Sequence, residues 1–247
     1  NIAPDGKIAF HTYSRFGVPP ITELVQLPGH QVSRALVANT QLKSRIAALQ
    51  KGPVEFFQVD VGNGVKLDGW VMKPLDFNPN QKYPLFFTNY GGPGSQTVLD
   101  GWGGSNYLWN LYLTQKGYLV ASVDNRGTGM RGREWRKIVY RQLGVIETQD
   151  QANAARVMGR WGYVDSTRIG VYGWSYGGFM SLNGLFQAPD VYRMAIAVAP
   201  VTHWKFYDNI YTERYNGLPQ DNKEGYDRGS PLTYVDQMRG RLLLVHG

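Results

Sequence analysis

The residue of this sequence best suited to covalent chemistry is a serine between glycines. Residues 168–179 read Arg-Ile-Gly-Val-Tyr-Gly-Trp-Ser-Tyr-Gly-Gly-Phe, so Ser175 stands in a Gly-x-Ser-x-Gly pattern. An apolar strand pattern precedes it and a helical pattern follows, which is the context of a nucleophile elbow, a tight strand-to-helix turn that exposes the serine hydroxyl. The positive end of the helix and its free N–H groups stabilise an anion there. The pattern predicts a nucleophilic serine, against the alternative of a serine that only caps a helix.

An elbow serine needs an oxyanion hole, a set of hydrogen-bond donors for the developing negative charge. The backbone N–H of Tyr176, the residue after the serine, supplies one donor. A second donor is expected at the end of an earlier strand, where Tyr90 opens the glycine-rich run Tyr-Gly-Gly-Pro-Gly-Ser-Gln. Either the Tyr90 hydroxyl or the N–H groups of this loop could serve, and the alternative is a loop with a packed tyrosine.

The serine also needs a histidine base and an acid to orient it, in the chain order serine, acid, histidine. Only two histidines follow Ser175. His203 comes too early for a base that must follow the acid, and His246 stands at the end of the last expected strand. Both are interpreted as structural residues, and we expect the acid and the base to lie beyond residue 247.

Composition and charge exclude several classes of protein. Hydrophobic residues make up 43% of the 247 residues and charged residues 18%, which is typical of a globular chain. The absence of cysteine excludes disulfides, thiolate zinc sites and a cysteine nucleophile. No apolar run approaches the roughly 18 residues of a membrane span, and residues 1–20 lack a signal-peptide pattern.

The net charge of +7 raises the question of a nucleic-acid partner. One stretch is densely basic, but it has few aromatics and no nucleic-acid-binding motif, so we expect a solvated arginine face and no nucleic-acid partner. This stretch comprises Arg126, Arg131, Arg133, Arg136, Lys137 and Arg141.

The first 72 residues carry strand and turn patterns around one helical candidate. Strands are expected at 8–13 and 21–27, after a Pro-Asp-Gly turn and a Pro-Pro pair respectively. A helix is expected over 32–49, on fair periodicity only. Residues 54–61 and 65–72 alternate around Gly-Asn-Gly, which predicts a hairpin.

From residue 83 onward, short apolar strands alternate with helix-length segments. This rhythm predicts an α/β fold with a largely parallel sheet. One helix is expected over 150–158, with Thr148 and Gln151 as a capping box, and another from Gly177 or Gly178 through Leu185. The expected strands are 85–89, 119–123, 169–172, 194–198 and 242–245.

Four motifs together resemble the dipeptidyl peptidase IV family of the prolyl oligopeptidase clan of serine peptidases, from about residue 54 to 247. They are Gly-Trp-Ser-Tyr-Gly-Gly at 173–178, Tyr-Gly-Gly-Pro-Gly-Ser-Gln at 90–96, Val-Asp-Asn-Arg-Gly-Thr-Gly at 123–129, and the run 199–215, which ends in Tyr-Thr-Glu-Arg-Tyr. The resemblance implies an α/β-hydrolase fold, C-terminally incomplete, preceded by the end of a β-propeller. It places the propeller end and connecting segment at 1–52 and the catalytic domain, lacking its last strands, at 53–247.

The resemblance implies a serine exopeptidase that releases X-Pro or X-Ala dipeptides from free N-termini. Ser175 matches the nucleophile, and the Tyr90 hydroxyl and Tyr176 N–H match the oxyanion hole. Without the resemblance, the aromatic residues after 200 would be read as core. With it, the substrate-binding residues are Trp174, Val201, Trp204, Tyr207 and Tyr211, and Tyr176 also faces the proline pocket.

The resemblance also implies partners and a location. It implies no cofactor and no metal, a homodimer, and amine-binding glutamates before residue 1. The lack of cysteine suits a bacterial member exported to the periplasm or cell surface. Two alternatives stay open: another peptidase of the clan, either an endopeptidase or an acylaminoacyl peptidase, which the run Tyr-Thr-Glu-Arg-Tyr at 211–215 disfavours, and a non-catalytic scaffold homologue.

Overall fold

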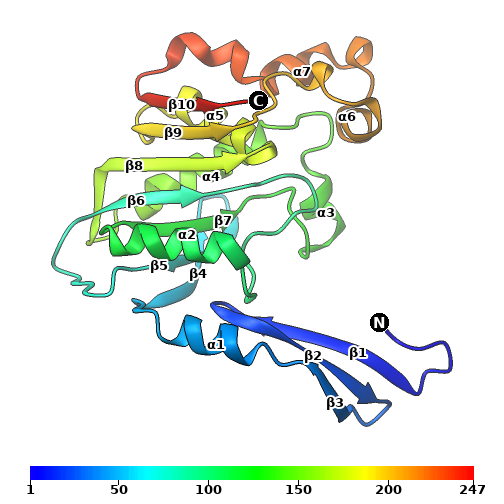
Figure 1. Cartoon of the computed structure of the whole chain (residues 1–247). Helices are drawn as coiled ribbons and strands as arrows, with labels where there is room; N and C mark the ends of the chain where they lie inside the picture. Colours follow the sequence, from blue (N-terminus) through cyan, green and yellow to red (C-terminus); the bar gives the residue numbers. More distant parts are fainter. The chain divides into compact units, whose positions relative to one another are not determined.

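The computed structural model describes all residues from 1 to 247 and divides into two compact units (Figure 1). The first unit comprises Asn1–Lys51 and Leu99–Tyr112, and the second comprises Gly52–Val98 and Leu113–Gly247. Helix α2, Gly104–Gln115, therefore contributes residues to both units.

The first unit is built on a three-stranded antiparallel sheet of β1 (Ile8–Arg15), β2 (Val18–Gln26) and β3 (Gln31–Val37). The first two strands confirm the prediction. The helix expected over 32–49 is wrong in its first part, because β3 pairs with β2 and only α1, Thr40–Ala47, is helical. All of β3 is exposed, so its apolar residues do not form the buried face that the periodicity implied.

The second unit contains a seven-stranded sheet in the order β10-β9-β8-β6-β7-β5-β4. The β4–β5 hairpin is confirmed, with Val54 opposite Met72 and Asp60 opposite Lys66. The strands β7, β6, β8, β9 and β10 run parallel, whereas β5 is antiparallel to both of its neighbours. Strand bounds are β4 Val54–Asp60, β5 Lys66–Met72, β6 Tyr83–Thr88, β7 Leu119–Asp124, β8 Val164–Trp174, β9 Met194–Val198 and β10 Arg241–Val245.

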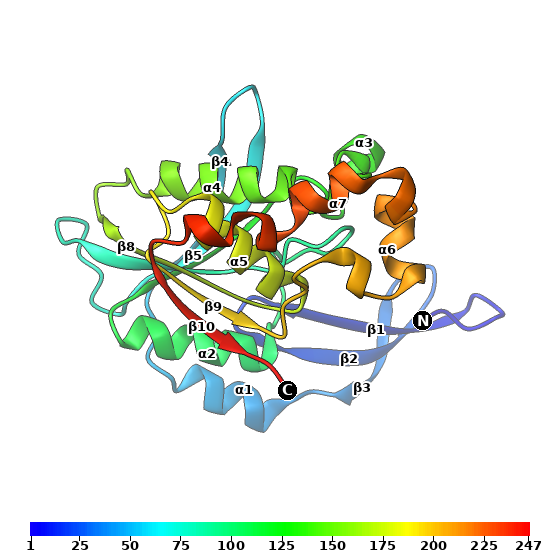
Figure 2. The same ribbon diagram turned by 90° about the horizontal axis from the view of Figure 1, so that it is seen from above.

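Helices α4 (Ile146–Met158) and α5 (Tyr176–Gln187) cover the same face of this sheet (Figure 2). The predicted capping box is wrong, because α4 begins before Thr148. The Thr148 hydroxyl donates to the Gly144 carbonyl, and the Gln151 amide donates to the Val123 carbonyl. The other helices are α3 Gly132–Lys137, α6 Asn209–Asn216 and α7 Lys223–Gly229, with 3₁₀ turns at Trp204–Phe206, Pro219–Asp221 and Pro231–Gln237.

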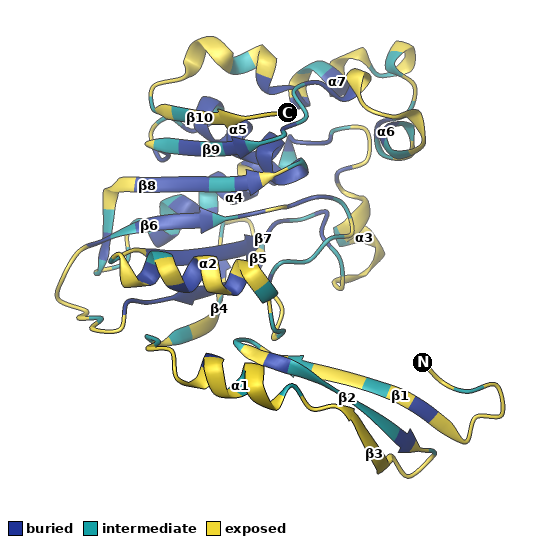
Figure 3. Ribbon diagram, in the orientation of Figure 1, coloured by how far each residue is buried: buried dark blue, intermediate teal, exposed yellow.

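The core of the second unit lies along its central strands (Figure 3). Every residue of β7 is buried, and so is all but one residue of α5. Strands buried on both faces are typical of a parallel sheet covered by helices. Because the parallel strands end at one edge, the segments after β6, β7, β8 and β9 emerge together, which is where ligands bind in open α/β sheets.

Candidate active site

Ser175 occupies the turn between β8 and α5 in a strained backbone conformation. Its φ is 57° and its ψ is −115°, a region that residues other than glycine rarely adopt. The Ser175 N–H donates to the Val198 carbonyl at 2.9 Å, and the Ser175 carbonyl accepts from the Phe179 N–H at 3.0 Å. The expected strand-to-helix elbow is therefore present, locked to β9 on one side and to α5 on the other.

The glycines around the serine are required by close backbone packing. A Cβ on Gly173 would lie 2.3 Å from the carbonyl carbon of Gly177, and a Cβ on Gly177 would lie 2.4 Å from the Asn89 carbonyl oxygen. A Cβ on Gly178 would lie 2.7 Å from the Val198 carbonyl oxygen. Contacts this short do not occur for real Cβ atoms, so the elbow can pack between the ends of β6 and β9 only with glycine at these positions.

Two hydrogen-bond donors stand free near the elbow. The Tyr176 N–H is at the first position of α5, where helices leave their N–H groups unpaired, and it makes no hydrogen bond. Tyr90 follows β6 and is 37% exposed, and its ring centroid lies 5.9 Å from that of Tyr176. Partial burial, with Tyr207 and Tyr215 close by, raises the pKa of Tyr90. Its hydroxyl therefore keeps its proton at neutral pH and can donate it.

A buried polar network, which sequence analysis missed, holds the glycine-rich loop after Tyr90. The Asn125 amide donates to the Gly91 carbonyl at 3.0 Å, and the Gln151 amide donates to the Asn125 side-chain oxygen at 3.0 Å. Asp124 accepts from the N–H groups of Thr97 and Val98. Burial raises the pKa of Asp124, although these hydrogen bonds oppose the rise. The sequence signal was the Asp-Asn pair directly after a buried strand.

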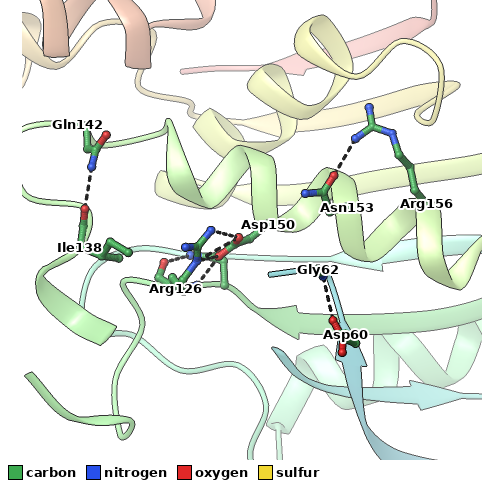
Figure 4. Close-up of polar contacts among 9 residues, drawn as sticks. Asp60, Gly62, Arg126, Ile138, Gln142, Asp150, Asn153 and Arg156 are labelled. Carbon is green, nitrogen blue, oxygen red and sulfur yellow. Dashed lines mark hydrogen bonds and ion pairs between the residues drawn. The ribbon is translucent and has the colours of Figure 1, made fainter. Parts of the chain in front are cut away.

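Arg126 lies in the loop after β7 and is held by an ion pair to α4 (Figure 4). Its Nη2 lies 2.7 Å from Asp150 Oδ1, and its Nε and backbone N–H also donate to the same carboxylate. The Asp150 side chain is 1% exposed. Within the basic stretch, Arg131 stacks on Trp135, with the guanidinium 3.8 Å from the ring centroid. These two arginines serve local packing.

The predicted pocket residues after β9 form a continuous aromatic cluster with Tyr176. Trp204 is 1% exposed, and its ring centroid lies 5.2 Å from that of Tyr176 and 5.6 Å from that of Tyr211. Tyr207 packs edge-on against both Trp204 and Tyr211 and remains 46% exposed. Burial and neighbouring phenols raise the pKa of Tyr211. Trp204 thus forms the buried floor of the cluster, and Tyr207 its exposed rim.

The two other predicted substrate-binding residues are Val201 and Trp174. Val201 is half-buried and packs against the aromatic cluster. Trp174, the residue before the serine, is 62% exposed. A cavity of about 600 Å³ opens alongside Tyr215, which itself packs on Tyr211. It is lined by Pro93, Gly94, Arg136, Lys137, Val139, Tyr140, Arg214 and Tyr215.

The two histidines that follow Ser175 in the chain, His203 and His246, differ in burial. His203 is buried, its Nε2 lies 3.4 Å from Asp227 Oδ1, and burial lowers its pKa. His246 is exposed after β10.

No group of three or more His, Asp or Glu side chains is arranged to hold a metal ion. No helix is both long and apolar enough to span a membrane.

The fold and the elbow define the class of protein: an α/β-hydrolase unit preceded by the end of a β-propeller. Residues 105–247 match the model of the prolyl oligopeptidase family, and the chain belongs to that family. It is 42% identical to the crystal structure of Porphyromonas gingivalis dipeptidyl peptidase 4, with a TM-score of 0.95 over 99% of this chain and 34% of that one.

Curated relatives agree with this assignment. The chain is 40% identical over 219 residues to "Probable dipeptidyl-aminopeptidase B" of Metarhizium robertsii, covering 88% of this chain and 24% of the relative. It is 35% identical over 234 residues to "Probable dipeptidyl peptidase 4" of Emericella nidulans, covering 92% and 30% respectively. The chain thus spans less than a third of the length of these curated relatives.

Proposed function

We propose that the whole protein is a serine exopeptidase that releases N-terminal X-Pro, or X-Ala, dipeptides by acyl transfer through Ser175. The observation that carries the proposal is the strained Ser175 turn beside an unpaired Tyr176 N–H and the aromatic cluster around Trp204. Strain of this kind persists where the surroundings enforce it, and it is concentrated at functional sites. The names of the relatives, all dipeptidyl peptidases, support the choice of substrate.

The proposed reaction proceeds in two steps. Ser175 Oγ attacks the carbonyl carbon of the second substrate residue, the peptide C–N bond breaks, and the leaving amine takes the proton that the serine hydroxyl gives up. Water then attacks the ester, releases the dipeptide and restores the serine hydroxyl. The Tyr176 N–H and the Tyr90 hydroxyl would stabilise the oxyanion in both steps. His203 is engaged with Asp227 and His246 is exposed after β10, so neither is assigned as the general base.

The aromatic cluster would account for a preference for proline. A pocket walled by Tyr176, Trp204 and Tyr211 offers flat apolar faces to a compact ring, and the tyrosine hydroxyls can orient the neighbouring polar groups. Val201 and Tyr207 would complete this pocket, with Trp174 at the serine. A larger side chain would meet rings that already pack at centroid distances of 5 to 6 Å.

The proposal is tested with the whole protein and a glycyl-prolyl chromogenic substrate. We expect chromophore release by the wild type and none by Ser175→Ala, whereas the exposed Ser166→Ala variant of β8 keeps full activity. An N-blocked substrate should not be cut. Cleavage of the blocked substrate alone would indicate an endopeptidase or acylaminoacyl peptidase, and no cleavage of either would indicate a scaffold.

We propose the remaining properties on the same resemblance. Residues 1–52 would be the propeller end and connecting segment and 53–247 part of the catalytic domain. The protein would be an exported homodimer that acts on peptides in the periplasm or at the cell surface, without a cofactor. Cell fractionation and sedimentation of the whole protein test these points. A cytosolic location or a monomer would contradict them.

A further inference from the structure

One carboxylate, next to the start of α5, is fully buried with no cation paired to it. Glu147, in the first turn of α4, is 0% exposed. Its Oε1 accepts from the Tyr176 hydroxyl at 2.7 Å, and its Oε2 accepts from the Gly144 N–H at 3.0 Å. Arg126, the cation bound to α4, is paired with Asp150. The carboxylate is therefore held by neutral donors alone: the Tyr176 hydroxyl, the Gly144 N–H and the backbone N–H of Glu147 itself.

Such a group is costly for stability, so packing alone does not explain it. Transfer of a carboxylate from water to the protein interior is unfavourable unless its oxygens are fully hydrogen-bonded. Burial raises the pKa of Glu147 to about 7, although hydrogen bonds from its own backbone N–H, the Tyr176 hydroxyl and the Gly144 N–H oppose the rise. All of these partners are donors, so the arrangement of atoms matches the ionised carboxylate.

Tyr176, the side-chain partner of Glu147, has two predicted roles. The Tyr176 backbone N–H is the expected oxyanion donor, and its ring is a wall of the expected proline pocket. That ring packs on Phe179 and Trp204, both at centroid distances of 5.2 Å. On the other side a Cβ on Gly92 would lie 3.2 Å from Tyr176 Cγ. The hydroxyl is the one polar anchor on this side chain, and it is bonded to Glu147.

We propose that Glu147 is a positioning residue, whose carboxylate holds the Tyr176 phenol and thereby sets the direction of the Tyr176 N–H and the place of its ring. The inference rests on the proposed function. It assigns a role to the first turn of α4, a helix with no residue at the reacting atoms. The hydrogen bond between Glu147, at the start of α4, and Tyr176, at the start of α5, links the two helices and fixes the position of Tyr176.

The test measures the catalytic constant per active serine in the whole protein. In Glu147→Gln the Tyr176 hydroxyl and the Gly144 N–H compete for a single acceptor oxygen, which weakens the bond to Tyr176, whereas Tyr176→Phe removes that bond outright and keeps the ring. Titration with a fluorophosphonate counts the competent Ser175 sites. We expect kcat per titrated site to fall roughly tenfold in each variant, less than the roughly 100-fold or more that follows loss of an oxyanion donor. The double variant should match Tyr176→Phe, because that single variant already lacks the bond to position 147.

The exposed Glu134→Gln variant of α3 is the matched control and should keep the wild-type kcat. A merely structural role would lower the number of titrated sites but leave kcat per site unchanged, which would overturn the inference. Effects that multiply in the double variant would also overturn it. If Glu147→Gln does not fold, Tyr176→Phe alone decides by the same measure. A wild type that cleaves no glycyl-prolyl substrate would instead refute the proposed function.

Discussion

At the scale of single residues, the strained conformation of Ser175 depends on the glycines beside it, which let the backbone pack closely. A non-glycine residue at a positive φ costs about 1–3 kcal/mol and persists only when its neighbours over-determine it. Here Ser175 is bonded to Val198 and Phe179, and Gly173 and Gly177 touch backbone to backbone. Ser175 thus lies on a turn that can form only when the neighbouring positions 173 and 177 are glycine.

Gly173→Ala tests this dependence. Its Cβ would meet the Gly177 backbone at 2.3 Å, so the elbow must shift. We expect a loss of about 3 kcal/mol or more, at the upper end for overpacked sites, and a melting temperature lower by several degrees. Gly162→Ala is the matched control, because its Cβ would meet nothing within 4 Å. Differential scanning calorimetry of both variants decides. Equal melting temperatures would show that the elbow tolerates a side chain.

The residues of the site differ in how visible they were in the sequence. Ser175 was predictable because its strand, turn and helix signals are local and contiguous. Tyr90 was visible only as a tyrosine at a strand end before a glycine-rich loop. Glu147 and Asn125 were missed, because their roles come from contacts with Tyr176 and Gly91, which lie 29 and 34 residues away in the chain.

At the scale of elements, α4 is tied to the loop after β7 by one buried ion pair. Asp150→Asn would leave the Arg126 guanidinium facing a neutral amide. Removing one partner of a buried pair typically costs about 3–5 kcal/mol, and we expect the lower end because Arg126 keeps 22% exposure. Glu224→Gln, in the exposed pair with Arg228, should change stability by less than about 1 kcal/mol. Urea denaturation of both variants measures the difference, and equal midpoints would contradict it.

Strands were predicted correctly where they are buried, because burial determines the order of apolar and polar residues in the sequence. The five strands of the parallel part and the β4–β5 hairpin were found because buried strands read as apolar runs. The pattern failed in β3, which is exposed throughout, so its apolar residues carried no information about burial. It also misplaced the start of α4, because Glu147 and Thr148 are buried polar residues there rather than a solvent-exposed cap.

At the scale of the whole molecule, the buried acid should make stability depend on pH. Glutamate ordinarily titrates near 4.5, whereas burial raises the pKa of Glu147 to about 7 in the folded state. The Tyr176 hydroxyl is hydrogen-bonded to this carboxyl, and Asp150 and Tyr211 interact with it electrostatically. Between these pH values the folded state binds the proton that the unfolded state has lost. The contribution to stability is therefore full below pH 4.5 and is lost as the pH rises through 7.

Glu147→Gln cannot titrate and should lack this contribution. Relative to the wild type, the variant should gain on the order of 3 kcal/mol in free energy of unfolding between pH 4.5 and pH 8. Denaturation midpoints of the whole protein, measured at both pH values, give this difference directly. Glu134→Gln should follow the wild type, because that carboxylate is exposed. Parallel pH curves for Glu147→Gln and the wild type would mean that Glu147 titrates normally, and that the buried carboxylate carries no unusual energetic cost.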